Sequence, residues 1–196
     1  MIVSDSFVDQ YPAVKYNWLR SFQIHSSTIC RPPAMSQIRT QTIRGLTVGE
    51  TFTVSRKFIE QVMLTFADIT RDYNPIHFDE RFVAAKNLQG RICHGLLVGS
   101  LLTEIGGQIG WLASEMNFRF KKPVYFGDTI ECSLTITKID EQNRARSEVV
   151  YRNQNGTIVL EAELAGILPG DRERKVLAAI LAEEERNLKK MNKNDS

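Results

Sequence analysis

The chain has 196 residues, of which 42% are hydrophobic, and its 25 basic and 23 acidic residues leave a formal net charge of +2 at pH 7. This length and composition favour one soluble domain with extensions. No run of about 18 apolar residues occurs, which excludes a helical membrane span, and the basic excess is too small to indicate nucleic-acid binding.

Residues 1–34 read as an N-terminal extension of that domain. They combine prolines with a Ser-Ser-Thr run and show no sustained hydrophobic period, so we expect them to be flexible and Met35 to be an alternative start of translation. Asp5 and Asp9 argue against a mitochondrial presequence, and no apolar signal-peptide core is visible. The predicted location is the cytoplasm, which the three widely spaced cysteines also favour.

The main domain is predicted to begin with a strand and two helices. Residues 42–54 read as the first strand, with a turn at its two glycines. Ser55 then resembles a helix cap, and apolar residues at helical spacing predict an amphipathic helix over residues 56–69. Asp79 is predicted to cap a second, short helix over residues 80–86.

An acid and a histidine stand five residues apart in the turn between these helices. Pro75 fixes its own φ and disfavours a helical conformation at Asn74, so the chain must turn there. Asp72 and His77 can then point in the same direction and form an acid/base pair facing one cavity. Taken alone, an Asp and a His beside Asn-Pro are more often cap and turn residues than catalysts.

A second motif, His94-Gly95, precedes an apolar stretch that predicts a long buried helix over residues 95–110. Unpaired backbone N–H groups in its first turn favour an oxygen that carries negative charge. The Cys93-His94 pair could suggest a zinc ligand or a nucleophile. No further Cys or His lies at ligand spacing, so we expect no metal here.

Beyond this helix the hydrophobic pattern changes to a period of two. Alternating residues predict four strands, which lie around residues 118–120, 130–136, 145–152 and 157–167. Asn155-Gly156 is a strong hairpin signal between the last two strands. A strand, then helices, then an antiparallel meander predict an α+β domain with the long helix against one face of the sheet.

Past Pro169-Gly170 the composition changes again. Residues 170–196 predict a C-terminal amphipathic helix with charges of both signs between the apolar positions. Its apolar stripe consists of Val176, Leu177, Ile180, Leu181, Leu188 and Met191. We expect this helix to pack on the sheet or on a partner subunit, with binding to a membrane surface as the less favoured alternative.

Three motifs occur in a fixed order along the chain. They are Asp72-Tyr73-Asn74-Pro75-Ile76-His77, then Ile92-Cys93-His94-Gly95, then Phe118 to Asp128 with Lys122-Pro123-Val124 inside it. Together they resemble the MaoC-like (R)-specific enoyl-CoA hydratase family of hotdog-fold proteins. The resemblance assigns residues 35–169 to a hotdog domain, in which an antiparallel sheet wraps around a long central helix.

The family resemblance implies reversible hydration of trans-2-enoyl thioesters to (R)-3-hydroxyacyl thioesters. Asp72 and His77 would be the catalytic residues, and the backbone N–H of Gly95 would polarise the thioester carbonyl. Asn74 would brace the turn or touch the water. Thr103 stands where the family often carries a serine that hydrogen-bonds the catalytic aspartate, and a hydroxyl bonded to its own helix is an equal alternative.

Two further residues are candidates for substrate binding. His94 would shape the loop beside the substrate. Arg71 stands where the family usually has Gly, and in a left-handed conformation it would be strained by roughly 1 kcal/mol. Its guanidinium could lie near the phosphates of acyl-CoA, or it could simply be solvated.

The resemblance also implies a partner and a substrate carrier. The substrate would be a thioester of coenzyme A or acyl carrier protein, with no metal or redox cofactor. The protein would be a homodimer in which two long helices lie side by side, or a dimer of dimers. Two alternatives stay open, namely a hotdog acyl-CoA thioesterase and a non-catalytic module that binds acyl thioesters.

Overall fold

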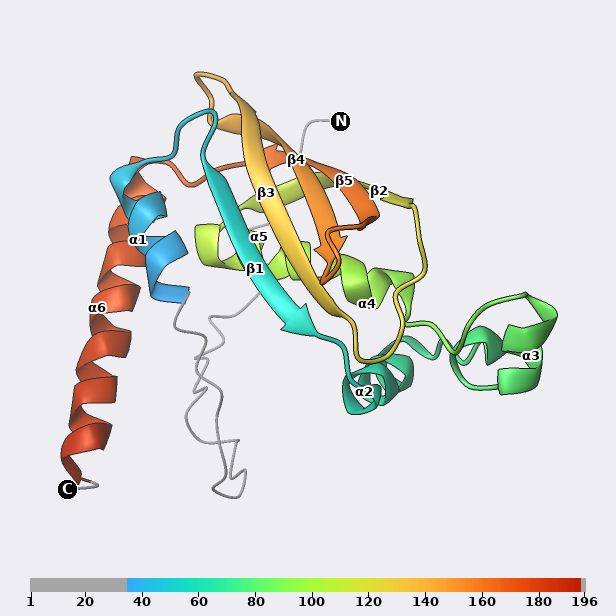
Figure 1. Ribbon diagram of the computed structural model, residues 1–196. Coiled ribbons are helices and arrows are strands. Elements are labelled where there is room, and N and C mark those ends of the chain that lie inside the picture. The colour runs from blue at the N-terminus through green and yellow to red at the C-terminus, as the bar shows by residue number, and fades with distance from the viewer. Residues whose placement is uncertain (1–34, 195–196) are drawn as a thin grey trace. The chain divides into compact units, whose positions relative to one another are not determined.

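The computed structural model describes the backbone of residues 35–194 and the side chains of residues 37–184 and 186. The predictions for residues 1–34 therefore lie outside the described residues. Within the described part, five strands form one antiparallel sheet in the order β1-β3-β4-β5-β2 (Figure 1). They are β1 (Thr51–Lys57), β2 (Leu112–Phe120), β3 (Thr129–Ile139), β4 (Arg144–Asn153) and β5 (Ile158–Ile167). Strands and helices together make the predicted α+β domain.

The period-two pattern of the sequence corresponds to a sheet with one buried face. In β3, Ile130, Cys132, Leu134 and Ile136 are all 0% exposed. The predicted hairpin at Asn155-Gly156 is confirmed, since Gly156 has φ 77° and its N–H donates to the Asn153 carbonyl at 2.8 Å. Glycine adopts this left-handed conformation without steric cost.

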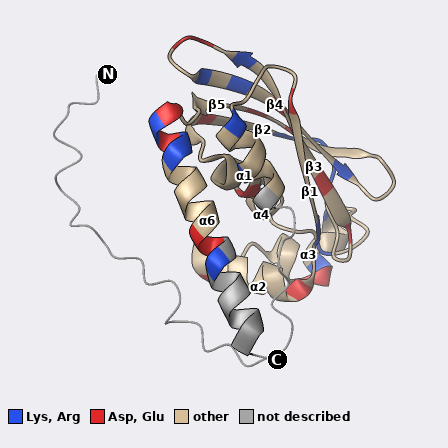
Figure 2. Cartoon of the chain, turned by 90° about the vertical axis from the view of Figure 1, so that its left-hand side faces the viewer, with Lys and Arg blue, Asp and Glu red and all other residues tan. Residues whose placement is uncertain are grey.

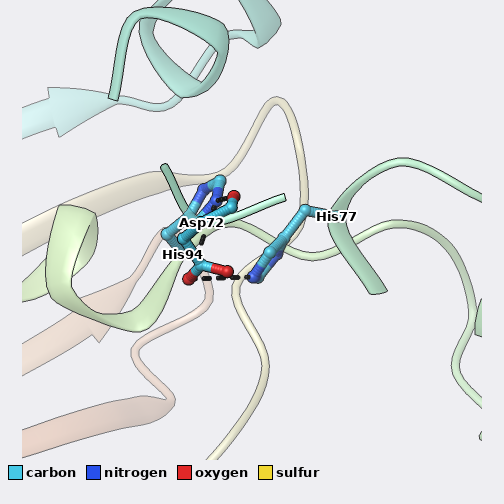
Figure 3. Close-up of side chains that lie close together, drawn as sticks. All are labelled: Asp72, His77 and His94. Carbon is cyan, nitrogen blue, oxygen red and sulfur yellow. Dashed lines mark hydrogen bonds and ion pairs between the residues drawn. The ribbon is translucent and has the colours of Figure 1, made fainter. Parts of the chain in front are cut away.

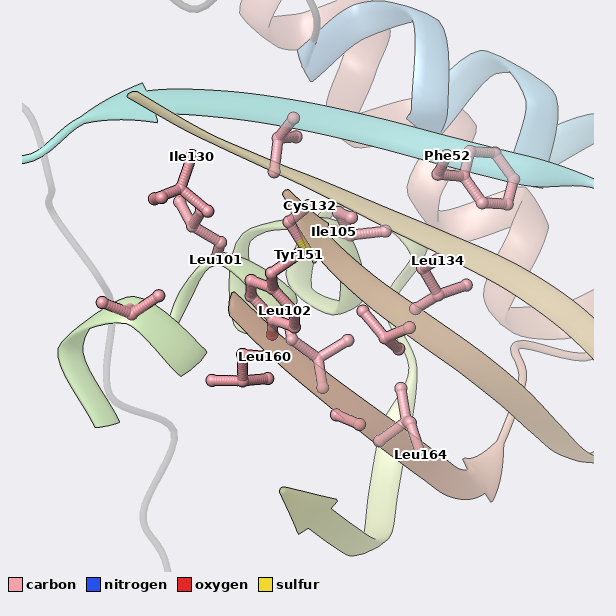
Figure 4. Packing of buried hydrophobic residues seen from close by; sticks show 14 of the residues in the cluster. Phe52, Leu101, Leu102, Ile105, Ile130, Cys132, Leu134, Tyr151, Leu160 and Leu164 are labelled. Atoms are coloured by element: carbon pink, nitrogen blue, oxygen red, sulfur yellow. The ribbon is translucent and has the colours of Figure 1, made fainter. Parts of the chain in front are cut away.

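The apolar stretch after His94 forms two helices, α4 (Gly95–Gly99) and α5 (Leu101–Ile109), which pack on the buried face of the sheet. Figure 4 shows Leu101, Leu102 and Ile105 among the buried side chains of the strands. The prediction of one continuous helix is wrong at Ser100. There the buried Tyr151 hydroxyl donates to the Gly99 carbonyl at 2.9 Å. The Thr103 N–H, which in a continuous helix would donate to the Gly99 carbonyl, donates to the Ser100 carbonyl. A side chain inserted into the hydrogen-bond ladder interrupts the helix in this way.

The prediction of a strand beginning at residue 42 is also wrong. Residues 42–44 belong to helix α1 (Met35–Arg44), and β1 begins only at Thr51. Thr42 is 0% exposed in α1, and Arg39 donates to the carbonyls of Gly107 and Gln108 at 3.5 and 3.4 Å. These contacts join segments far apart in the chain, so a local pattern does not contain them.

Ser55 is not a helix cap, which corrects another prediction. It lies in β1 opposite Glu131 of β3, and helix α2 (Glu60–Thr70) begins after Ile59 without a side-chain cap. Pairing with β3 continues through Lys57 and overrides the local cap signal. The short helix predicted after Asp79 is confirmed as α3 (Glu80–Ala85), whose first turn donates to the Asp79 side chain.

The predicted C-terminal helix is present as α6 (Asp171–Asn194), and it packs against α1. Arg39 of α1 pairs with Glu184 of α6 at 3.6 Å. Acidic and basic residues stand side by side in two charged groups of its described part, at residues 171–175 and 183–186, with uncharged residues between the groups (Figure 2). The side chains of Leu188 and Met191 lie outside the described set. None of the helices within residues 35–194 combines the length and apolar character needed to span a bilayer.

Candidate active site

Helix α2 ends at a residue with a left-handed backbone. Arg71 has φ 60° and ψ 23°, and its N–H donates to the Ala67 carbonyl at 2.7 Å. A non-glycine residue in this conformation is strained by roughly 1 kcal/mol. The strain expected from the sequence is therefore present, and it turns the chain sharply into Asp72.

Two side-chain-to-backbone hydrogen bonds shape the turn that follows. The Asp72 carboxylate accepts from the Asn74 N–H at 3.2 Å, and the Asn74 side chain accepts from the Ile76 N–H at 3.2 Å. Pro75 occupies the first position of the 3₁₀ helix η2 (Pro75–His77). Such bonds are what make Asp and Asn favourable in turns. They bring the side chains of Asp72 and His77 to the same side, and the Asn74 side chain accepts a hydrogen bond within the turn.

His77 presents one ring nitrogen to Asp72. Its Nδ1 lies 2.8 Å from the Ile92 carbonyl, which can only accept, so Nδ1 carries the proton and Nε2 is an acceptor. Nε2 lies 4.0 Å from Asp72 Oδ2 (Figure 3). Burial lowers the pKa of His77 below its ordinary value of 6.5, and the ring is only 6% exposed. The ring is therefore neutral at pH 7.

The geometry of the pair suits a ligand with two donors. A carboxylate oxygen and an unprotonated imidazole nitrogen are both acceptors, so they have no hydrogen bond to offer each other at 4.0 Å. A water molecule that reaches both atoms can donate one hydrogen to each. This is the arrangement that activation of a water molecule requires.

His94 contacts both members of the Asp72/His77 pair. Its Nε2 lies 2.8 Å from the Asp72 backbone carbonyl and therefore donates to it. Its ring stacks on that of His77, with centroids 3.8 Å apart and an angle of 27° between the planes. His94 is 1% exposed, and its Nδ1 has no hydrogen-bond partner among the described residues. These contacts fix the position of Asp72.

The same three residues offer atoms that could hold a metal ion. Ligand atoms of Asp72, His77 and His94 all lie within 4.8 Å of one another. The sequence analysis did not group these three residues, because 22 residues separate Asp72 from His94. His94 Nε2 is taken up by the Asp72 carbonyl, so this nitrogen is not free to bind a metal beside His77 Nε2 and the Asp72 carboxylate, which favours water over a metal.

The loop that carries Ile92 is held by Arg91. Its guanidinium pairs with Glu60 of α2 at 3.0 Å and with Glu80 of α3 at 3.1 Å. It also lies over the Phe126 ring, 5.2 Å from the centroid. Because the Ile92 carbonyl sets the His77 tautomer, the position of this loop matters for the acid/base pair.

Helix α4 begins at the edge of the site with Gly95. Its N-cap residue, His94, makes no side-chain cap, and first-turn N–H groups have no acceptor within their own helix. A Cβ atom at position 95 would lie 2.8 Å from the Phe120 ring, so only glycine allows this close contact. Gly95 thus lies directly against the Phe120 ring.

A cavity of about 450 Å³ adjoins the pair, and His77 and Gly95 form part of its wall. Asp72 is not among its lining residues. Most of the lining is apolar and includes Ile76, Leu88, Val98, Val124 and Val159. Cys93 also lines it, and burial raises the pKa of this thiol to about 12. It is therefore a wall residue and not a nucleophile.

Among the described residues, the side chains of Thr103 and Arg71 form no hydrogen bond or ion pair with Asp72 or His77. The Thr103 hydroxyl donates to the Ser100 carbonyl at 2.7 Å and not to Asp72, so the alternative of a hydroxyl bonded to its own helix describes it. Arg71 is exposed. Ile92 and Phe120 contribute to the site but were missed as site residues, because a backbone carbonyl and an aromatic wall leave no chemical signature in a sequence.

Comparisons with known proteins point to one family. A family model described as MaoC like domain matches residues 37–159. The (R)-specific enoyl-CoA hydratase of Aeromonas caviae is 28% identical over 131 residues, which are 64% of this chain and 98% of that protein. The mitochondrial 3-hydroxyacyl-[acyl-carrier-protein] dehydratase of Arabidopsis thaliana is 27% identical over 142 residues, 69% and 84% of the two chains. The solved (R)-hydratase from A. caviae involved in PHA biosynthesis is 28% identical with a TM-score of 0.61, over 64% of this chain and 99% of that one.

Proposed function

Since the chain belongs to the MaoC-like domain family, we propose that it catalyses the reversible hydration of trans-2-enoyl thioesters to (R)-3-hydroxyacyl thioesters. The names of its relatives, an enoyl-CoA hydratase and a 3-hydroxyacyl-carrier-protein dehydratase, support this reaction in both directions. The observation that carries the proposal is the 4.0 Å separation of His77 Nε2 and Asp72 Oδ2, two acceptors that face one position.

In the hydration direction, a water molecule donates one hydrogen to each of these acceptors. Its oxygen forms a bond to C3 of the enoyl group as one O–H bond breaks, and the proton passes to the Asp72/His77 pair. The pair then returns a proton to C2, where the electrons of the double bond have moved. Each such proton transfer typically accelerates a reaction by about a hundredfold or more.

The charge that develops on the thioester oxygen needs a donor. The Gly95 N–H has this role in our proposal, because it lies in the cavity wall next to His77 and starts a helix. Loss of such a donor typically costs on the order of 3 kcal/mol in transition-state stabilisation. The apolar part of the cavity would hold the acyl chain.

Crotonyl-CoA is the substrate that tests the proposal directly. Loss of the enoyl absorbance without release of free thiol is the expected result. Release of thiol would instead identify a thioesterase. Binding of crotonyl-CoA with neither change would identify a non-catalytic acyl-thioester module.

The assembly we propose is a homodimer formed through the edge strand β2. Met116 and Phe120 lie on one face of this strand, opposite Leu164 and Leu160 of β5, and they are 42% and 55% exposed, so apolar side chains stay uncovered beside an open sheet edge. Light scattering should give twice the mass of the chain, and Met116→Lys should shift it toward the monomer. A wild-type monomer would contradict the dimer.

The cytoplasm is the proposed compartment, and residues 1–34 the proposed extension of the hotdog domain. Cell fractionation tests the first. Two relatives are named as mitochondrial, so recovery of the protein in mitochondria is the result that would overturn it. Activity of a chain begun at Met35 tests whether the extension is dispensable.

A further inference from the structure

The charges around the cavity are not balanced. Its lining contains three lysines and no aspartate or glutamate. The whole chain, in contrast, has 25 basic and 23 acidic residues. Lysines that line an opening and have no carboxylate partner raise the local concentration of anions.

Two of these lysines are available to a ligand. Lys121 pairs with Glu161 at 2.8 Å, which neutralises it. Lys86 and Lys122 form no ion pair with a carboxylate of the described residues, and Lys86 lies 5.7 Å from the Phe82 ring centroid. Both side chains are exposed.

The backbones that carry these two side chains are fixed. The Lys86 N–H donates to the carbonyls of Phe82 and Val83 at 3.1 Å each, at the end of α3. The Lys122 N–H donates to the Val159 carbonyl at 3.1 Å. The two side chains therefore extend from fixed backbone positions in the cavity lining.

The cavity has a buried, mostly apolar interior and an exposed, positively charged rim. His77, Val98 and Leu160 in its wall are 6%, 2% and 1% exposed, while the lysines are exposed. A thioester carried on a pantetheine arm has the same order, with an apolar acyl chain and reactive carbonyl at one end and a phosphate ester at the other. Lysine binds phosphate as a point charge.

We propose that Lys86 and Lys122 bind the 4′-phosphate that ends the pantetheine arm. This inference rests on the proposed hydratase function and deepens it. The anion is common to coenzyme A and to carrier-protein thioesters, so the two lysines anchor substrate from either source.

The test compares crotonyl-pantetheine, which lacks the phosphate, with crotonyl-4′-phosphopantetheine. In the Lys86→Ala/Lys122→Ala double variant, the ratio of kcat/KM for the phosphorylated over the unphosphorylated thioester should fall about tenfold, the effect of a few charge-assisted contacts. Lys138→Ala, which removes an exposed lysine outside the cavity lining, should leave both kcat/KM values unchanged.

A ratio unchanged in the double variant would overturn the inference. So would a loss confined to crotonyl-CoA, because that would assign the lysines to the phosphates of its adenosine half. The wild-type kcat/KM for crotonyl-CoA against crotonyl-carrier protein then identifies the preferred source. If the wild-type protein hydrates none of these thioesters, the proposed function fails, and that result differs from an unchanged ratio.

Discussion

Replacing Asp72 with asparagine separates its chemical role from its structural one. The Asp72 carboxylate accepts from the Asn74 N–H at 3.2 Å, and the side-chain oxygen of an asparagine can accept the same hydrogen bond. The bond from His94 goes to the backbone carbonyl of residue 72, which the substitution does not change. The free energy of unfolding should therefore change by less than about 0.5 kcal/mol. The carboxylate that accepts the water proton is lost, so kcat should fall at least about a hundredfold, or about 2.7 kcal/mol in activation free energy.

The assay for Asp72→Asn is the loss of enoyl absorbance with crotonyl-CoA, followed beside thermal unfolding. Asp79→Asn is the matched control, because Asp79 follows the same turn closely in the chain and asparagine caps α3 as well as aspartate does. Its kcat should equal that of the wild type. If Asp72→Asn kept more than a tenth of the wild-type kcat, the assignment of Asp72 as a proton acceptor would be refuted.

Three further predictions follow from the site. Because burial lowers the pKa of His77, kcat/KM should decrease with falling pH only below pH 6.5. The free energy of unfolding should also decrease below pH 6.5, because the unfolded chain binds a proton at His77 more readily than the folded protein does. A decrease in kcat/KM that already begins at pH 7 or above contradicts this. Arg91→Ala should lower kcat and shift that acid limb, with partial recovery in Arg91→Lys, whereas a change in KM alone would argue against a role through Ile92. Gly95→Ala should reduce kcat by about tenfold or more by moving Phe120, and Gly95→Ala/Phe120→Ala should recover part of the loss; no recovery would disprove the steric cause.

The sequence predicts most reliably those caps and turns whose conformation depends only on neighbouring residues. Asp79 caps α3, and Asn155-Gly156 turns between β4 and β5, because each needs only its immediate neighbours. The Asp72 to His77 turn belongs to the same class, since its hydrogen bonds span two residues each.

Contacts between distant segments account for the errors. Residues 42–44 are helical because α1 packs against α5 and α6, and Ser55 stays in a strand because β3 pairs with it. The role of Ile92 depends on a carbonyl that meets His77 across 15 residues. His94 reaches the backbone of Asp72 in the same manner. Local spacing carries no information about such pairs.

The bond from Tyr151 to Gly99 makes the direction of α4 depend on the C-terminal end of β4. Without that hydroxyl, the Gly99 carbonyl could accept from Thr103, and the two helical segments would straighten into a single rod. The backbone N–H of Gly95, at the start of α4, would then point in a different direction. A substitution in β4 can thus change substrate selectivity although every residue that contacts the substrate is unchanged.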